Sequence, residues 1–218
     1  MNRSLILIMI YCFGILGLVA QTSPASQMDG EQVVVSNNLN VDGSPLLYDD
    51  WEDATLVDVQ GKKYENAQVN YDGLRSKFIA PHTSENNIIE LNSFHYREVQ
   101  IQDTGDRFLN GSPYGSLGFL RVIFEDDKFI LFEKFSSIKR TKDKETYASV
   151  TAMYKIKNTK TLYVYTQDDG LVEVGRKYKD FESVFGVEGL KSFIKAEKLK
   201  LKNDPDLVRL MEYCSSRM

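Results

Sequence analysis

The chain has 218 residues, with 31 acidic and 27 basic side chains and a formal net charge of −4. Residues 29 to 106 hold 15 acids and 5 bases, whereas the rest of the chain is mildly basic. A nucleic-acid-binding protein of this size would show a dominant basic face, so this distribution argues against a nucleic-acid partner.

The first 20 residues predict a secretory signal peptide. Arg3 supplies a short positive start, and an apolar run from Leu5 to Val19 leads to Ala20, a small residue at a plausible cleavage point. The run is short for a membrane span, which needs about 20 apolar residues, although an uncleaved N-terminal anchor is the alternative. We therefore expect an exported protein in the periplasm, at the outer membrane or outside the cell, with no transmembrane segment in the mature chain.

Residues 21 to 42 are polar and rich in Ser, Gln and Asn, which predicts a mobile leader. From residue 43 to 175, short alternating segments separated by turn residues predict an antiparallel β domain. Three hairpins are expected, with turns at Gln60-Gly61, Asp126-Asp127 and Asn158-Thr159. The third hairpin would join residues 147–157 to residues 160–166.

The hydrophobic period changes from 2 to 3.6 in residues 176 to 218, which predicts a helical tail. Two short amphipathic helices are expected, with a single turn over residues 180–185 before them. Asp204 is placed as the N-cap of the last helix and Pro205 in its first turn. The apolar stripe of that helix consists of Leu207, Leu210, Met211 and Cys214. Cys214, the one cysteine after the signal segment, is therefore expected to be a buried structural residue.

These patterns predict a mainly β fold of the α+β class. The antiparallel hairpins would form a twisted sheet, a partial barrel or a sandwich. Two to three short C-terminal helices would pack on it, because helices of this length are not stable alone in water.

The stretch LLYDDWED, residues 46 to 53, holds the only Trp of the chain, Trp51, among four carboxylates. In an extended segment Asp49 and Asp53 point to one side and Asp50 to the other. The carboxylates then do not converge on a calcium ion, which needs six to eight oxygens. No metal site and no cofactor are expected here, and a solvated strand entry is the plainer interpretation.

Carbohydrate binding is a second interpretation of the same stretch. Flat aromatic rings beside carboxylates are typical of sugar sites, and the candidate ligand-binding residues are Trp51, Asp49, Asp53, Tyr163 and Tyr165. Tyr163 and Tyr165 would share one face of their strand as a small platform. Tyr is also an ordinary half-buried strand residue, so a purely structural role stays open.

Catalysis has little support in the sequence, and no catalytic residue is assigned. The chain has only two histidines, His82 and His95, and their spacing matches no HExxH motif. Ser116 lies in a Gly-rich segment, but no Lys follows it as a phosphate-binding loop requires. A hydrolase that combines His82 or His95 with the acids near Trp51 is kept as an alternative function.

The most highly charged loop candidate is SIKRTKDKET, residues 137 to 146. Its cations are suited to an anionic surface such as lipopolysaccharide or phospholipid headgroups. A solvated hairpin tip is the competing interpretation, because the signs alternate over residues 142 to 145.

Three segments of the chain resemble one group of small exported proteins of Bacteroidetes-type bacteria. These are GSPLLYDDW with the following GKKY hairpin, LRVIFEDDKFILFEKF, and the Lys-rich tail from YKDFESVFG onward, which together cover most of residues 43 to 216. The chain departs from the group at Leu46-Leu47, where Tyr-Leu is expected. The resemblance implies export and a shared architecture, and it assigns no activity, cofactor or catalytic residue.

The sequence as a whole favours a non-catalytic exported protein of the cell envelope that acts as a scaffold or binding module. Its expected partner is another envelope protein or a glycan. The alternatives are the glycan-binding protein that uses Trp51 and surface tyrosines, and the hydrolase.

Overall fold

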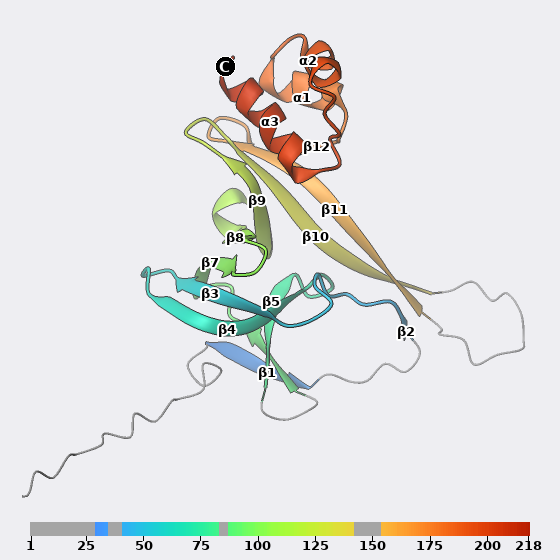
Figure 1. The fold of residues 1–218 in the computed structure, drawn as a ribbon. Coiled ribbons are helices and arrows are strands. Elements are labelled where there is room, and N and C mark those ends of the chain that lie inside the picture. Colours follow the sequence, from blue (N-terminus) through green and yellow to red (C-terminus); the bar gives the residue numbers. More distant parts are fainter. Residues whose placement is uncertain (1–28, 35–40, 83–86, 142–153) are drawn as a thin grey trace, which may run out of the picture.

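The structure is a computed structural model that describes residues 29–34, 41–82, 87–141 and 154–218 (Figure 1). The predicted signal peptide and most of the predicted leader lie outside these residues. The protein is mainly β, with 48% of its residues in strands and 18% in helices, which confirms the predicted class.

The strands are β1 Gly30–Val34, β2 Val41–Asp42, β3 Glu52–Asp58, β4 Lys63–Asp72, β5 Lys77–Pro81, β6 Asn87–Leu91, β7 Tyr96–Ile101, β8 Arg107–Asn110, β9 Phe119–Glu125, β10 Ile130–Thr141, β11 Tyr154–Thr166 and β12 Gly170–Val174. The helices are α1 Tyr178–Phe185, α2 Leu190–Ala196 and α3 Asp204–Ser215.

The strands form one open twisted sheet in the order β1-β6-β5-β4-β3-β7-β8-β9-β10-β11-β12, and β2 pairs with β11. Strands β3 to β6 form one run of hairpins, and β7 to β12 form a second run. The two runs meet where β3 pairs with β7. Of the predicted alternatives, the twisted sheet is therefore the observed one.

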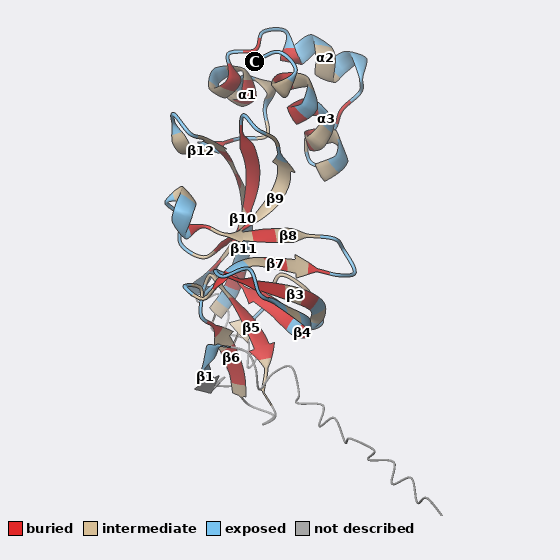
Figure 2. Cartoon of the chain, turned by 90° about the vertical axis from the view of Figure 1, so that its left-hand side faces the viewer, coloured by how far each residue is buried: buried red, intermediate tan, exposed pale blue. Residues whose placement is uncertain are grey.

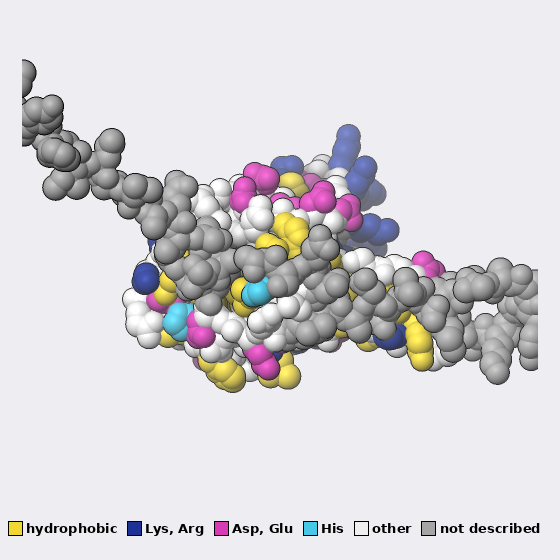
Figure 3. Space-filling model, turned by 90° about the horizontal axis from the view of Figure 1, so that it is seen from below, with side chains coloured by type: hydrophobic (Ala, Val, Ile, Leu, Met, Phe, Trp, Pro, Cys, Tyr) yellow, Lys and Arg dark blue, Asp and Glu magenta, His cyan; other side chains and the backbone are white. Residues whose placement is uncertain are grey.

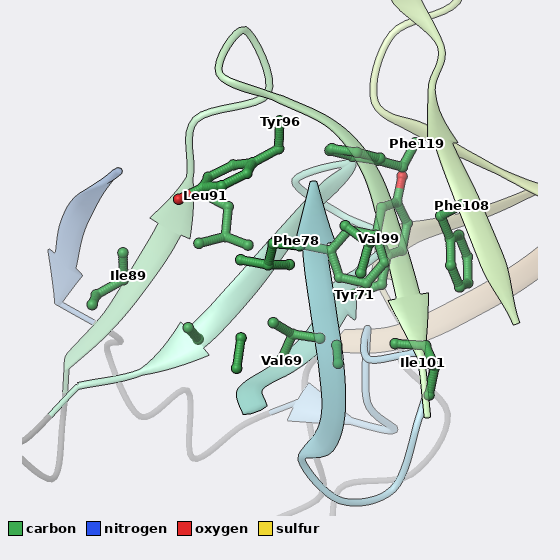
Figure 4. Packing of buried hydrophobic residues seen from close by; sticks show 14 of the residues in the cluster. Val69, Tyr71, Phe78, Ile89, Leu91, Tyr96, Val99, Ile101, Phe108 and Phe119 are labelled. Carbon is green, nitrogen blue, oxygen red and sulfur yellow. The ribbon is translucent and has the colours of Figure 1, made fainter. Parts of the chain in front are cut away.

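Strands of both runs enclose one aromatic core (Figure 4). Phe78 lies at its centre, with ring centroids 5.1 Å from those of Tyr71 and Phe108 and 5.2 Å from that of Phe119. All four rings are at most 2% exposed. Edge-to-face packing of this kind adds to the hydrophobic stabilisation from burial.

Two of the three predicted hairpins are confirmed, and the third is wrong. The turns at Gln60-Gly61 and Asp126-Asp127 connect β3 to β4 and β9 to β10. Asn158-Thr159, however, lies inside the continuous strand β11, which pairs with β10 over twelve residue pairs. The side chain of Asn158 accepts a hydrogen bond from Ser137 Oγ at 2.8 Å and donates one to Ser44 O at 3.1 Å. Pairing over the whole length of β10 thus outweighs the local turn preference of Asn158.

The three C-terminal helices pack on one end of the sheet, as predicted (Figure 2). The predicted single turn before the two helices is a complete helix, α1, whose Asp180 carboxylate accepts the backbone N–H of Lys177 at 3.1 Å. The last helix begins one residue earlier than predicted, with Asn203 as its N-cap. Among the described residues no helix is long and apolar enough to cross a bilayer.

Two short strands lie within the segment expected to be a leader. β1 adds to the edge of β6, and Gly30 is needed there because a Cβ at this position would lie 2.4 Å from Ile89 Cγ2. β2 pairs in parallel with the far end of β11.

Candidate functional site

Strands β9 to β12 have two different faces, and the pairing register shows which side chains share each face. Directly opposed residues of an antiparallel pair lie on the same face, and successive residues alternate. Phe132 is opposite Tyr163 and Val122, and Ile130 is opposite Tyr165, which in turn is opposite Leu171. We call this side the open face. The side that holds Leu131, Glu133, Leu162 and Val164 is the helix-covered face.

The helix-covered face is filled by apolar side chains from both the sheet and the helices. Leu207, Leu210, Met211 and Cys214 of α3 are fully buried against Leu131 and Val164 of the sheet. Burial raises the pKa of the Cys214 thiol to about 12. The thiol is thus held protonated and inert, which agrees with the expected structural role.

A network of charged residues ties the helix-covered face to the tail. Glu133, 4% exposed, accepts hydrogen bonds from Arg121 and Arg176, each at 2.8 Å. Arg121 also donates to Asp204 at 2.7 Å and to Asp106 at 3.0 Å. These five residues are called the Arg121–Glu133 network. Burial alone would lower the pKa of Arg121, but the hydrogen bond to Asp204 and the carboxylates of Glu133, Asp204 and Asp106 raise it, so the guanidinium stays charged.

Each buried charge of the network has a partner within the chain, so the network stabilises the packing of the segments that it connects. It joins the turn between β7 and β8, strands β9 and β10, the segment before α1 and the start of α3. Asp106 also accepts the hydroxyl of Tyr48 at 3.0 Å, so the entry to β3 is fixed to the same network. Burial, the charge of Asp106 and this hydrogen bond raise the pKa of Tyr48.

The open face carries a separate cluster of apolar and aromatic side chains. Leu120, Ile130 and Phe132 are its buried members, and no residue of the three helices belongs to it. Among the described residues, only Tyr114 comes from outside the strands, from the short 3-10 helix Ser112–Tyr114. Tyr163, Tyr165 and Leu171 are half-buried, so parts of their side chains stay accessible.

Tyr114 connects the rings of this face into one aromatic surface. Its ring centroid lies 4.9 Å from that of Phe132 and 4.8 Å from that of Tyr165, with the latter pair edge to face. Burial, followed by the charge of Glu125, raises the pKa of Tyr114. Burial and the neighbouring carboxylate of Glu173, which accepts its hydroxyl, raise the pKa of Tyr163. The face therefore combines aromatic rings, neutral phenol hydroxyls and a carboxylate.

The candidate residues of the LLYDDWED stretch lie elsewhere in the sheet. Trp51 comes just before β3, five places from β11 in the strand order. The stretch is held by the buried amide of Asn70, which donates to Tyr48 O at 2.9 Å and to Asp50 O at 2.8 Å. The carboxylates of Asp49 and Asp53 are exposed, and no group of three metal-ligating residues occurs in the described part of the chain. The five predicted site residues thus form two separate surfaces.

His95 lies beside other carboxylates than those near Trp51. His95 Nδ1 lies 3.4 Å from Asp29 Oδ2, and His95 Nε2 lies 4.0 Å from Asp58 Oδ2. The carboxylate of Asp58 is engaged in the turn between β3 and β4. It accepts hydrogen bonds from the backbone N–H groups of Gln60 and Lys62 and from the hydroxyl of Tyr64. Burial alone would raise the pKa of Asp58, but these hydrogen bonds lower it. The view from below shows acidic side chains gathered in one group at the upper edge of this face and others scattered over it (Figure 3).

The sequence interpretation missed several members of the open face. The strand β8, which carries Leu109, was not predicted, and Tyr114 was considered only as part of a Gly-rich loop. Phe132 and Leu171 were placed on strands, but their position beside Tyr163 and Tyr165 depends on the register between strands. The alternation of aromatic residues along residues 163 to 165 was the one signal of this face in the sequence.

Comparison with models of known protein families, with curated proteins and with solved structures finds no match to this chain. The functional interpretation therefore depends on the geometry of the chain itself.

Proposed function

We propose that the protein is a non-catalytic exported binding module of the cell envelope that recognises a glycan on the open face of β9–β12. Tyr163, Tyr165 and Tyr114 supply aromatic surface, and Glu173 supplies a hydrogen-bond acceptor beside them. Small-ligand sites commonly combine an apolar, aromatic lining with a few oriented polar groups.

The observation that carries the proposal is the difference in covering between the two faces of one sheet. The three helices pack on one face and bury its central side chains, whereas the aromatic face takes no helix residue. An accessible group of aromatic side chains on an otherwise well-packed sheet indicates an interaction surface. The half-buried state of Tyr163 and Tyr165 supports this, since each ring is fixed by neighbours and still reaches the surface.

This proposal moves the glycan site away from Trp51. Trp51 is 38% exposed but lies on the strand entry held by Asn70, without an aromatic partner in the described residues. Its indole therefore serves as an internal reporter that distinguishes the two locations.

The test is isothermal titration calorimetry of the full chain with dextran, a β-glucan and polygalacturonate. The double variant Tyr163→Ala/Tyr165→Ala is expected to lose at least about tenfold in affinity, as each aromatic contact contributes roughly 1 kcal/mol. The matched control is Tyr154→Ala, which removes a tyrosine on the same strand but on the opposite face. There the Nζ atom of Lys139 lies 4.2 Å from the centroid of the Tyr154 ring.

The fluorescence of Trp51 is recorded in the same titrations. Binding without a change in its spectrum supports the open face. A spectral change that persists in the double variant places the glycan at Trp51 instead. Absence of binding to all three polysaccharides, or equal losses in the control, contradicts the proposal.

A further inference from the structure

The open face continues beyond the aromatic cluster along the paired strands β10 and β11. The two strands stay in register over twelve pairs without a bulge, from Ile130 opposite Tyr165 to Thr141 opposite Tyr154. β10 and β11 form a long ribbon whose far end, with β2 beside it, extends past the rest of the sheet (Figure 1). The period of two therefore assigns every side chain of this ribbon to a face.

The residues that share the open face change in type along the ribbon. On β11 they are Tyr165, Tyr163, Thr161, Thr159, Lys157 and Lys155, and on β10 they are Ile130, Phe132, Lys134, Ser136, Ile138 and Arg140. Aromatic side chains thus give way first to hydroxyls and then to cations. From Tyr165 to Lys155 the line is about 33 Å long at 3.3 Å per residue.

The far part of the ribbon is strongly basic. Residues 136–141 and 154–160 hold five basic side chains and no acidic one. Arg140, Lys155 and Lys157 are exposed on the open-face side, and Lys134 donates to Ser116 Oγ at 3.2 Å at the junction with the aromatic cluster. The four cations Lys134, Arg140, Lys155 and Lys157 are called the basic stripe.

Cations on the opposite side of the ribbon are engaged within the chain. Lys160 lies 3.6 Å from the carboxylate of Glu133, and Lys139 lies over the ring of Tyr154. On the open-face side, the one described acid beside the basic stripe is Asp42 of β2, whose backbone pairs with Lys155. The basic stripe therefore carries an excess of positive charge on the side that also presents the tyrosines.

We propose that the aromatic cluster and the basic stripe form one continuous site for a linear acidic polysaccharide. This inference rests on the proposed glycan function and names the class of glycan. Sugar rings pack against Tyr163 and Tyr165, the hydroxyl of Thr161 provides hydrogen bonds, and the hydroxyl of Thr159, which donates to Ser136 O at 3.4 Å, accepts one. The cations of the basic stripe bind carboxylate or other anionic substituents.

The chemistry of the ribbon favours a polysaccharide over a membrane surface. A protein that lies on a bilayer inserts a large apolar face among the headgroups. On the basic part of the ribbon, Ile138, 43% exposed, is the one exposed large apolar side chain in the described residues. A line of hydroxyls and cations about 33 Å long instead matches an extended polymer that presents its charges at intervals.

The experiment compares polygalacturonate with the same polymer after methyl esterification, which removes its charge and keeps its backbone. The variant Arg140→Gln/Lys155→Gln/Lys157→Gln is expected to bind polygalacturonate about tenfold more weakly, with a shallower dependence on salt. Its binding to the esterified polymer is expected to stay unchanged. The matched control is Lys179→Gln/Lys195→Gln/Lys202→Gln, which removes the same charge from exposed positions of the tail.

The outcomes separate the inference from the proposed function. Equal binding of both polymers, or equal losses in the two triple variants, overturns the acidic-polysaccharide inference but leaves glycan binding at the tyrosines intact. Loss of both polymers in the tyrosine double variant, with a loss of the acidic polymer alone in the stripe variant, supports both. A stripe variant that loses binding to vesicles of anionic phospholipid, and not to polygalacturonate, overturns the inference in favour of a membrane surface.

Discussion

The two faces of strands β9 to β12 differ in what covers them, and we assign stability to one face and, in the proposed function, ligand binding to the other. On the helix-covered face, fully buried side chains of α3 pack on the sheet, and the charged groups pair with each other. On the open face, the tyrosine rings are half-buried and most of the basic stripe is exposed to solvent. The same strands supply both, since successive residues alternate between the faces.

The two faces also differ in how their charged side chains are used: some are buried and paired within the chain, and others are exposed. Glu133 has two arginine partners and is buried, so its charge is needed inside the fold. Arg140 and Lys157 are exposed on the far part of the ribbon, where residues 136–141 and 154–160 hold no acid, so their charge has no carboxylate partner on those strand segments. Variants on the two faces should therefore affect different measurements.

The largest effect is expected from removal of α3. Deletion of residues 204–218 exposes the apolar surface under four fully buried side chains of α3 and removes Asp204, one of the three carboxylate partners of Arg121. The free energy of unfolding should fall by at least about 5 kcal/mol, which is comparable to the stability of a whole domain. Chemical denaturation followed by circular dichroism measures this.

The point variant Leu210→Ala keeps the chain folded and tests the same packing. It should cost about 2 to 5 kcal/mol, because Leu210 is fully buried. An unchanged unfolding midpoint in both variants would mean that the helices do not stabilise the sheet.

The next largest effect is expected in the Arg121–Glu133 network. Glu133→Gln leaves Arg121 and Arg176 facing a neutral side chain, and the loss should be about 2 to 4 kcal/mol, since the carboxylate is buried. Glu125→Gln is the control from the other face, where the Arg107–Glu125 pair is exposed and should be worth less than about 1 kcal/mol. Similar losses in the two variants would remove the distinction between the faces.

A smaller change in stability is expected on the open face. Tyr165→Ala removes a half-buried ring and its edge contact with Tyr114, which should cost about 1 to 2 kcal/mol. Its effect on polysaccharide affinity should exceed its effect on stability. The reverse ranking, with intact binding and a loss as large as that of Leu210→Ala, would assign this ring to the core.

The smallest effect at neutral pH comes from Cys214, because it develops only as the pH rises. Its pKa is about 12 in the folded protein and 9.0 in the unfolded chain, so the neutral thiol is favoured by folding. This stabilisation is complete below pH 9 and is lost as the pH rises towards about 12. Cys214→Ala should therefore lose less stability than the parent protein between pH 9 and pH 11 in parallel denaturation series. If the free energy of unfolding fell with pH at the same slope in both proteins, the thiol would not leave water on folding.

Local patterns predicted the elements of the fold well where the turn residues and the pairing agreed. Gln60-Gly61 and Asp126-Asp127 were turns because the strands beside them pair with each other. Asn158-Thr159 has the same local preference but lies opposite Ser136 and Ser137 of a long partner strand. Such a partner cannot be recognised within a window of a few residues.

The candidate site was predictable only in part for the same reason. Alternation along β11 places Tyr163 and Tyr165 on one face, and this follows from the sequence alone. Their contact with Tyr114 and their distance in the strand order from Trp51 depend on how strands separated by many residues pair. The basic segment at residues 137–146 was expected to be a loop, but residues 137–141 belong to β10, and residues 142–146 lie outside the described residues. The continuity of the described part with the tyrosines appeared only with the register of β10 and β11.

The strand order has a consequence for how the chain acquires its structure. Within β3–β6 and within β7–β12 every neighbour in the sheet is also a neighbour along the chain, so each run can assemble through short loops. The junction of β3 with β7 instead closes a loop of about 40 residues, which carries the larger entropic cost. We expect this junction to limit the folding rate, so Leu56→Ala, opposite Val99 at the junction, should slow refolding more than Leu162→Ala on β11.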